Sequence, residues 1–132
     1  MNHSADFNDS FERNVSNNYE VFFQAFYESF QAKSPEIKAV FQNTEKSRRH
    51  EMLEDSILML MECSLNHAPS EHICRLAEFH RERGIPEAMY DVWLESLVET
   101  LYRLDAEFTA AEEEAWRAVL LPGISYMRQH AY

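Results

Sequence analysis

The segment LAEFHRERGIPEAMY, residues Leu76–Tyr90, decides the fold, because it combines the end of one amphipathic helix, a stop and the start of another. Gly84 supplies the stop, since glycine takes the left-handed conformation that closes many helices at little cost. Pro86 suits the first turn of the next helix. Leu76 and His80 lie four residues apart and share the inward face of the first helix. What His80 does there depends on what the rest of the chain places opposite it.

Apolar residues recur with helical spacing along most of the chain, and only two Gly and four Pro interrupt them. The spacing predicts helices over about residues 5–17, 19–33, 35–41, 47–66 and 71–83, a sixth that begins at Pro86, and a last one that begins at the capping box Thr109–Glu112. The acidic run over residues 112–114 is expected to be a solvated first turn. No strand is predicted, so the fold class is all-α.

Length and charge limit the number of domains and the classes of partner to be expected. The 132 residues correspond to one domain, residues 1–132, and the net charge of −11 disfavours nucleic acid and anionic membrane surfaces as partners. No apolar run is long enough to cross a bilayer. The N-terminal MNHSADFNDS lacks a basic start and an apolar stretch, so we expect no secretory signal and a cytoplasmic location.

Three segments, in this order, resemble the globin family. FYESFQAKSPEIKAVFQN (residues 26–43) resembles the second and third globin helices, residues 76–93 resemble the proximal helix and the turn after it, and TAAEEEAWRAV (residues 109–119) resembles the start of the last helix. The matches span about residues 19–128, and the nearest pattern is that of single-domain bacterial globins and the haem domains of flavohaemoglobins. The resemblance implies a globin fold, with about seven to eight helices around a haem pocket and haem b as cofactor.

The resemblance also implies roles for individual residues. His80 matches the proximal ligand of the haem iron, and Tyr90 matches a tyrosine of the proximal hydrogen-bond network. Phe41 matches the phenylalanine that packs flat on the haem. Tyr27, fourteen residues earlier, matches the distal tyrosine that donates a hydrogen bond to the bound ligand. The last helix reads SYMRQHAY in the region where flavohaemoglobins carry a carboxylate partner for the tyrosine, so that carboxylate has no match at the expected place.

The distal helix allows more than one alignment. The preferred one puts Arg48 at the distal gate and Met52 against the haem face, one helical turn later. A shift of one or two residues puts Arg49 or His50 at the gate instead. Outside that role, His50 is expected to be solvated.

Haem chemistry fits these residue types. One neutral imidazole holds the iron, and its other N–H is expected to donate to the backbone carbonyl of residue 76 or 77. The haem plane needs an apolar slot, and six side chains are candidates to line it: Phe41, Met52, Leu76, Ile85, Trp93 and Leu97.

Three function classes remain open at this stage. The first is a haem protein that reversibly binds oxygen, carbon monoxide or nitric oxide at a five-coordinate iron. The second is a haem enzyme that turns over nitric oxide, nitrite or peroxide, with nitric oxide dioxygenase or nitrite reductase as side activities, and that takes electrons from an external reductase. The third is a haem-free sensor or adaptor domain. The sequence leaves open whether the protein is a monomer or a homodimer.

Overall fold

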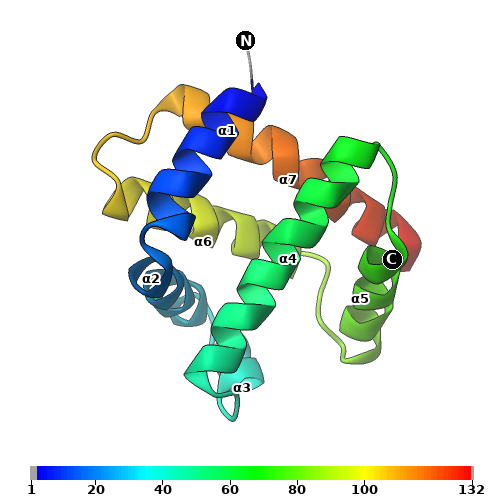
Figure 1. Cartoon of the computed structure of the whole chain (residues 1–132). Helices are drawn as coiled ribbons and strands as arrows, with labels where there is room; N and C mark the ends of the chain where they lie inside the picture. Colours follow the sequence, from blue (N-terminus) through cyan, green and yellow to red (C-terminus); the bar gives the residue numbers. More distant parts are fainter. Residues whose placement is uncertain (1–2, 132) are drawn as a thin grey trace.

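The computed structural model describes residues 3–131, in which seven α-helices and one π-helical segment follow one another without any strand (Figure 1). The elements are α1 (His3–Phe11), η1 (Glu12–Ser16), α2 (Tyr19–Ala32), α3 (Pro35–Phe41), α4 (Lys46–Asn66), α5 (Glu71–Glu82), α6 (Met89–Leu104) and α7 (Ala110–Ala131). The predicted all-α fold class is therefore confirmed. No helix within these residues is long and apolar enough to cross a membrane.

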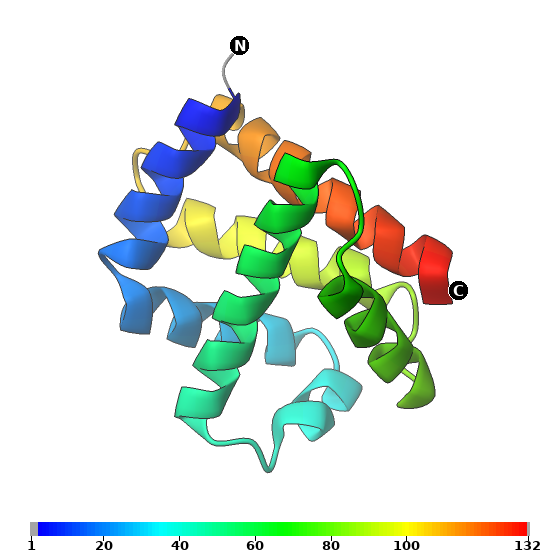
Figure 2. The same cartoon turned by 45° about the vertical axis from the view of Figure 1, so that its right-hand side comes forward.

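The last helix organises the packing. Helix α7 packs against α1, α4 and α5, while α2 packs against α6. In both ribbon views α4 crosses in front of α6 and α7, and α5 lies beside the C-terminal half of α7 (Figures 1 and 2). Buried aromatic side chains fill the space between the helices, and Phe22, Phe23, Phe26 and Trp116 are fully buried. Three of these four rings belong to α2, so this helix contributes much of the aromatic core.

Local sequence signals fix several of the helix ends. The Ser34 and Ser70 side chains accept hydrogen bonds from backbone N–H groups in the first turns of α3 and α5. Thr109 and Glu112 form the predicted capping box, in which each side chain accepts a hydrogen bond from the other residue's backbone N–H. Gly84 has φ of +71°, the left-handed conformation expected after α5.

Helix α6 begins later than predicted. We expected it to begin at Pro86, but it begins at Met89. Turns precede the helix, since Met89 N–H donates to the Pro86 carbonyl at 3.0 Å and Tyr90 N–H donates to that of Glu87 at 3.1 Å. These bonds join residues three apart, whereas α-helical bonds join residues four apart. The turn before α6 therefore places Tyr90 close to the end of α5.

A polar cluster of Arg13, Asn14, Asp105 and Glu112 joins the N-terminal helices to the α6–α7 corner. Arg13 Nη2 lies 2.7 Å from Asp105 Oδ2 and 2.9 Å from Glu112 Oε2, and Asn14 Nδ2 donates to Asp105 Oδ2 at 2.9 Å. The expectation of a solvated run over residues 112–114 is wrong for Glu112, which is only 9 % exposed. Its partner Arg13 lies almost a hundred residues earlier, beyond the reach of a local pattern.

Replacing Asp105 with Ala should lower the free energy of unfolding by about 3 kcal/mol, because the substitution leaves the Arg13 guanidinium and the buried Asn14 amide without their shared acceptor. Urea unfolding at pH 7 measures the change. The exposed Asp91→Ala serves as a control, since its side chain is 68 % exposed and should have a much smaller effect. Equal effects of the two substitutions would contradict the prediction.

Asp105 also makes the stability of the fold depend on pH. Burial alone would raise the pKa of Asp105, but hydrogen bonds from Arg13 and Asn14 outweigh it and hold the pKa below its ordinary value. A carboxyl with a lowered folded-state pKa stabilises the fold above its ordinary pKa of about 4, and this contribution is lost as the pH falls through the lower folded-state value. The wild type should therefore lose more stability in that range than Asp105→Ala does, as acid titration followed by circular dichroism would show.

Candidate functional site

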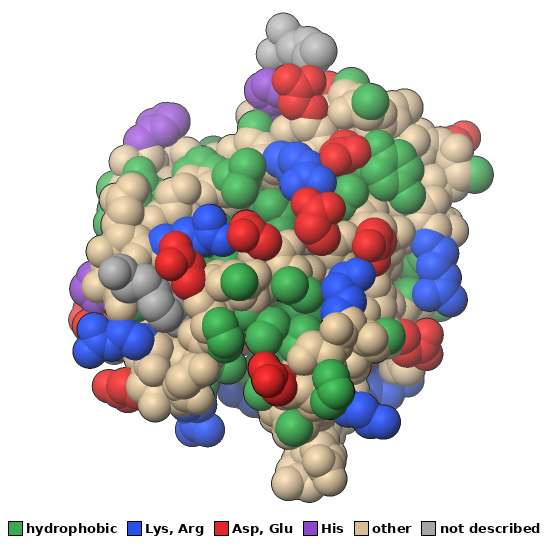
Figure 3. Space-filling model, turned by 180° about the vertical axis from the view of Figure 1, so that it is seen from behind, with side chains coloured by type: hydrophobic (Ala, Val, Ile, Leu, Met, Phe, Trp, Pro, Cys, Tyr) green, Lys and Arg blue, Asp and Glu red, His purple; other side chains and the backbone are tan. Residues whose placement is uncertain are grey.

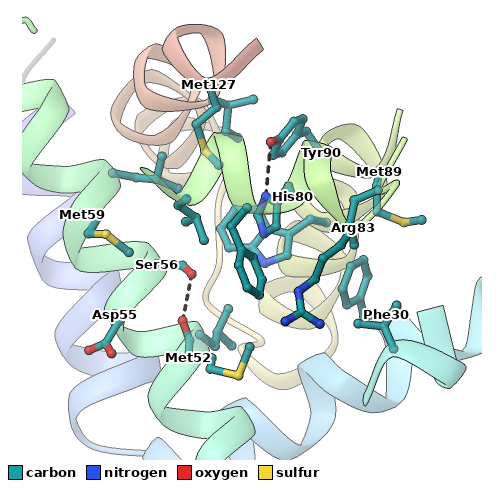
Figure 4. A pocket seen from close by; sticks show the side chains of 18 of the residues that line it. Phe30, Met52, Asp55, Ser56, Met59, His80, Arg83, Met89, Tyr90 and Met127 are labelled. Atoms are coloured by element: carbon teal, nitrogen blue, oxygen red, sulfur yellow. Dashed lines mark hydrogen bonds between the residues drawn. The ribbon is translucent and has the colours of Figure 1, made fainter. Parts of the chain in front are cut away.

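A cavity of about 700 Å³ lies between α4, α5 and the start of α6, and α2, α3 and α7 complete its wall (Figure 4). Its volume is within the range of small-molecule and cofactor sites. The structure brings together nine of the residues assigned from the sequence to the pocket: Tyr27, Phe41, Arg48, Met52, Leu76, His80, Ile85, Tyr90 and Trp93. In the close view, Met52, Ser56 and Met59 of α4 lie across the cavity from His80 of α5.

Leu97 does not belong to this group. It was expected to line the slot, but it is fully buried in the core and absent from the cavity wall. The wall follows α6 through Met89, Tyr90 and Trp93, and Leu97 lies one turn further along the helix. The periodicity places Leu97 on an inward face correctly, but it does not tell how far along that face the cavity extends.

His80 is held by Tyr90. The Nδ1 atom of His80 lies 3.2 Å from the Tyr90 hydroxyl oxygen, and the dashed line in Figure 4 marks this contact. The structure thus gives Nδ1 a tyrosine hydroxyl as its partner, where we expected the backbone carbonyl of residue 76 or 77. Burial lowers the pKa of His80, which favours the neutral imidazole that can coordinate a metal. With Nδ1 engaged, Nε2 is the nitrogen that remains for a ligand.

Tyr27 also lines the pocket, and its hydroxyl proton already takes part in a hydrogen bond. The hydroxyl donates to the backbone carbonyl of Arg49 at 2.7 Å, and burial raises the pKa of this side chain, which is 6 % exposed. A phenol has one proton. Donation from Tyr27 to a ligand in the pocket therefore requires that the hydroxyl leave the carbonyl of Arg49.

The three candidates for the distal gate lie in different environments. Only Arg48 lines the cavity; its side chain is 61 % exposed and lies 3.4 Å from Glu51. The Arg49 guanidinium carbon lies 5.8 Å from the centroid of the Tyr27 ring. His50 is 3 % exposed and stacks on Tyr27 with ring centroids 6.5 Å apart, so the expectation of a solvated His50 is wrong. Its surroundings on α2, which decide its burial, are distant in sequence.

Sequence reasoning missed part of the wall. Arg83 follows His80 at the i+3 position and lines the mouth of the cavity, where its guanidinium carbon lies 4.3 Å from the centroid of the Phe79 ring. Arg75 of α5 adds a further basic side chain. The signal for Arg83 was its helical spacing from His80. Four of the six methionines also line the cavity, and their flexible side chains suit a large apolar surface: Met52, Met59, Met89 and Met127.

The wall fits a haem group. Most side chains of the wall are apolar, which suits a flat macrocycle, and Arg75 and Arg83 suit its two carboxylates. Among residues 3–131, no group of three or more His, Cys, Asp or Glu side chains could hold a metal ion. Haem iron needs only one axial protein ligand, and His80 is a half-buried imidazole in the wall that could provide one.

Comparison with known proteins gives a match to one family and to one solved structure. The model of the globin family matches residues 24–122. The fold is similar to the crystal structure of a protein from Pseudomonas aeruginosa PAO1 that is described as structurally highly homologous to a human hemoglobin, with a TM-score of 0.82, 26% sequence identity and 98% of each chain covered. No curated protein matches the sequence. With a family match over three quarters of its length and an all-helical fold over residues 3–131, the chain belongs to the globin family.

Proposed function

We propose that the protein binds haem b through His80 and reversibly binds oxygen or another diatomic ligand at a five-coordinate iron. The observation that carries the proposal is the contact of His80 Nδ1 with the Tyr90 hydroxyl at 3.2 Å on the wall of an apolar cavity of about 700 Å³. Globins as a family bind diatomic gases, which supports the class of ligand. When bound, haem supplies an iron atom with one axial position open to such a ligand.

Several side chains of the pocket would hold the cofactor, each through a different contact. His80 would coordinate through Nε2, and Tyr90 would fix the orientation of the ring by accepting a hydrogen bond from Nδ1–H. Phe41 and Met52 would cover the macrocycle and exclude water from it. Arg83, with its guanidinium over Phe79, would pair with a carboxylate at the mouth of the cavity. These roles follow from residue type and from membership of the cavity wall.

Absorption spectra of the purified protein test the proposal. We expect a Soret band that shifts on reduction and shifts again when carbon monoxide is added to the reduced protein. A ferrous spectrum of five-coordinate type would support an open axial position, and a six-coordinate one would contradict it. No Soret band after haem is added back would sink the haem function and favour a haem-free adaptor domain.

Tyr27 is the proposed distal donor, and Tyr27→Phe tests this role. The substitution should lower the free energy of unfolding by about 1 kcal/mol, because the hydrogen bond to the Arg49 carbonyl is lost. If the hydroxyl moves to the ligand, oxygen should also dissociate about tenfold faster, as expected for one charge-assisted hydrogen bond. Stopped-flow displacement of oxygen by carbon monoxide measures the rate.

Tyr102→Phe is a matched control, because the Tyr102 hydroxyl donates to Glu113 on the surface and Tyr102 is absent from the cavity wall. Its oxygen dissociation rate should equal that of the wild type. A Tyr27→Phe variant that is less stable but releases oxygen at the wild-type rate would show that the proton stays on the Arg49 carbonyl.

We also propose that the protein acts in the cytoplasm. Its two cysteines, Cys63 and Cys74, are both free thiols, which supports a reducing compartment. Fractionation of the native cells tests this location.

A further inference from the structure

Arg128 of α7 lies against the first turn of α6. Its Nη2 atom is 2.7 Å from Asp91 Oδ1, and its Nε atom is 3.7 Å from Glu87 Oε1. The guanidinium carbon lies 6.0 Å from the centroid of the Tyr90 ring, at the outer limit of a cation–π contact. Two carboxylates thus hold a cation, whose side chain is 31% exposed, beside the ring of Tyr90.

The same tyrosine touches His80. Tyr90 thus has both neighbours: its ring lies beside the Arg128 guanidinium, and its hydroxyl oxygen lies 3.2 Å from Nδ1 of His80. Three residues from three helices therefore form a continuous path: Arg128 of α7, Tyr90 of α6 and His80 of α5. We propose that Arg128 is a positioning residue that acts through Tyr90 and makes His80 a weaker electron donor to haem iron, an inference that rests on the proposed haem function.

Electrostatics sets the direction of the effect. A cation beside an aromatic ring draws electron density away from the ring and from its hydroxyl oxygen. That oxygen accepts the hydrogen bond from Nδ1–H, so a less basic oxygen leaves the imidazole less electron-rich. Hydrogen bonding to an axial ligand is one of the means by which a protein sets the reduction potential of haem. Arg128 therefore favours the ferrous iron, the form of a globin that binds oxygen.

Asp91 and Glu87 fix the sign of the effect expected when the positive charge of Arg128 is removed. Replacing Arg128 with Gln removes a positive charge and also leaves these two carboxylates without their partner. Both changes make the surroundings of Tyr90 more negative. Replacing Asp91 with Asn has the opposite sign, because it removes negative charge and leaves Arg128 less compensated. The Asp91 side chain is 68% exposed, so this variant should fold like the wild type.

The experiment compares haem-loaded wild type, Arg128→Gln and Asp91→Asn by spectroelectrochemical titration. We expect Arg128→Gln to shift the ferrous–ferric equilibrium about threefold toward the ferric form, or ~28 mV at 59 mV per tenfold. The iron–histidine stretching frequency of the reduced protein should rise. Asp91→Asn should shift both quantities in the opposite direction. Arg128→Lys, which keeps the charge, should restore most of the wild-type potential.

Arg117→Gln is the matched control. Arg117 lies eleven residues before Arg128, on the same face of α7, and it also pairs with α6, at 3.0 Å from Glu95. Its side chain is 30% exposed, like that of Arg128, but it has no contact with Tyr90 among the described residues. Seen from behind, acidic and basic side chains lie side by side on the surface (Figure 3). Arg117→Gln therefore controls for the loss of an ion pair between α7 and α6 away from Tyr90. Its potential should equal that of the wild type.

Tyr90→Phe separates action through the tyrosine from a simple field effect. Without the hydroxyl, Arg128→Gln should no longer change the iron–histidine frequency. An effect that persists in the Tyr90→Phe background, or one that Arg117→Gln reproduces, would overturn the proposal. Loss of the Soret band in the wild type would instead contradict the haem function itself, so the two failures are distinguishable.

Discussion

Replacing His80 with Ala should abolish stable haem binding, with a loss of affinity greater than the roughly 10- to 100-fold that removal of a ligand's hydrogen-bond partner costs. The reason is that a globin-type haem iron has one protein ligand, and His80 is the neutral, half-buried imidazole in the wall of the cavity. Retention of haem during gel filtration, followed by the ratio of Soret to protein absorbance, measures the effect. Added imidazole should restore the spectrum, because it can fill the space that the side chain leaves.

His72→Ala is the control for this experiment. His72 also belongs to α5 and lines the same cavity, two turns before His80, but it is exposed. It should retain haem in the five-coordinate form. The haem-free His80→Ala protein should unfold within about 1 kcal/mol of the wild type, since it loses one hydrogen bond to Tyr90. A His80→Ala protein with an unchanged ferrous spectrum would show that another side chain holds the iron.

The helices themselves could be predicted because their signals are local. Ser34, Ser70 and Thr109 accept hydrogen bonds from N–H groups two or three residues away, and Gly84 ends α5 through its own backbone conformation. A single sequence contains all the information that such contacts need. The late start of α6 is the exception, because Pro86 begins a turn as readily as a helix.

The other errors concern contacts between residues distant in sequence. Glu112 was predicted to be solvated, but in the fold Arg13 lies beside it. His50 was also predicted to be solvated, but aromatic rings of α2 cover it. Leu97 was assigned to the cavity because periodicity gives the inward face of a helix but not what lies against each turn. Neither charge pairing nor burial between helices can be read from spacing.

The site, too, was predicted only in part. The wall residues follow from helical spacing and from the resemblance, whereas the partners of their polar atoms do not. The hydroxyl of Tyr27 donates to the carbonyl of Arg49, and Nδ1 of His80 meets a tyrosine that belongs to another helix. Arg128, whose guanidinium lies beside that tyrosine, gave no signal in the sequence beyond the absence of the expected carboxylate. Polar partners are decided by the tertiary fold.

Gly123→Leu should destabilise the protein by about 2 kcal/mol although leucine is the better helix former. Gly123 lies inside α7, where α7 crosses α4, and a Cβ atom there would overlap Leu60 Cδ2 and lie 3.4 Å from Leu60 Cα. Leucine gains about 1 kcal/mol of helix propensity over glycine, but overpacking costs up to about 3 kcal/mol where a large side chain must displace a buried one, here Leu60, so the net loss is about 2 kcal/mol. Urea unfolding of the haem-free protein measures the balance.

Ala118→Leu is the control, because Ala118 is exposed on the same helix and the substitution adds volume without a clash. Its unfolding free energy should be close to that of the wild type. The cost of Gly123→Leu should also fall in the background of Leu60→Ala, since that change removes the overlapping atom, and a double-mutant cycle measures this coupling. Additive effects would show that Leu60 is not the obstacle.

The crossing of α7 and α4 links the stability of the fold to the shape of the cavity. Leu60 and Ile124, the residue after Gly123, both line the cavity, so a side chain that drives α7 away from α4 also changes the shape of the pocket. Gly123→Leu should therefore release haem faster than the wild type, whereas Asp105→Ala, which acts at the far α6–α7 corner, should lower stability without this effect. Transfer of haem to a scavenger protein measures both rates. Equal rates for the two variants would mean that stability alone, and not the packing of α7 against α4, controls how long the pocket holds its cofactor.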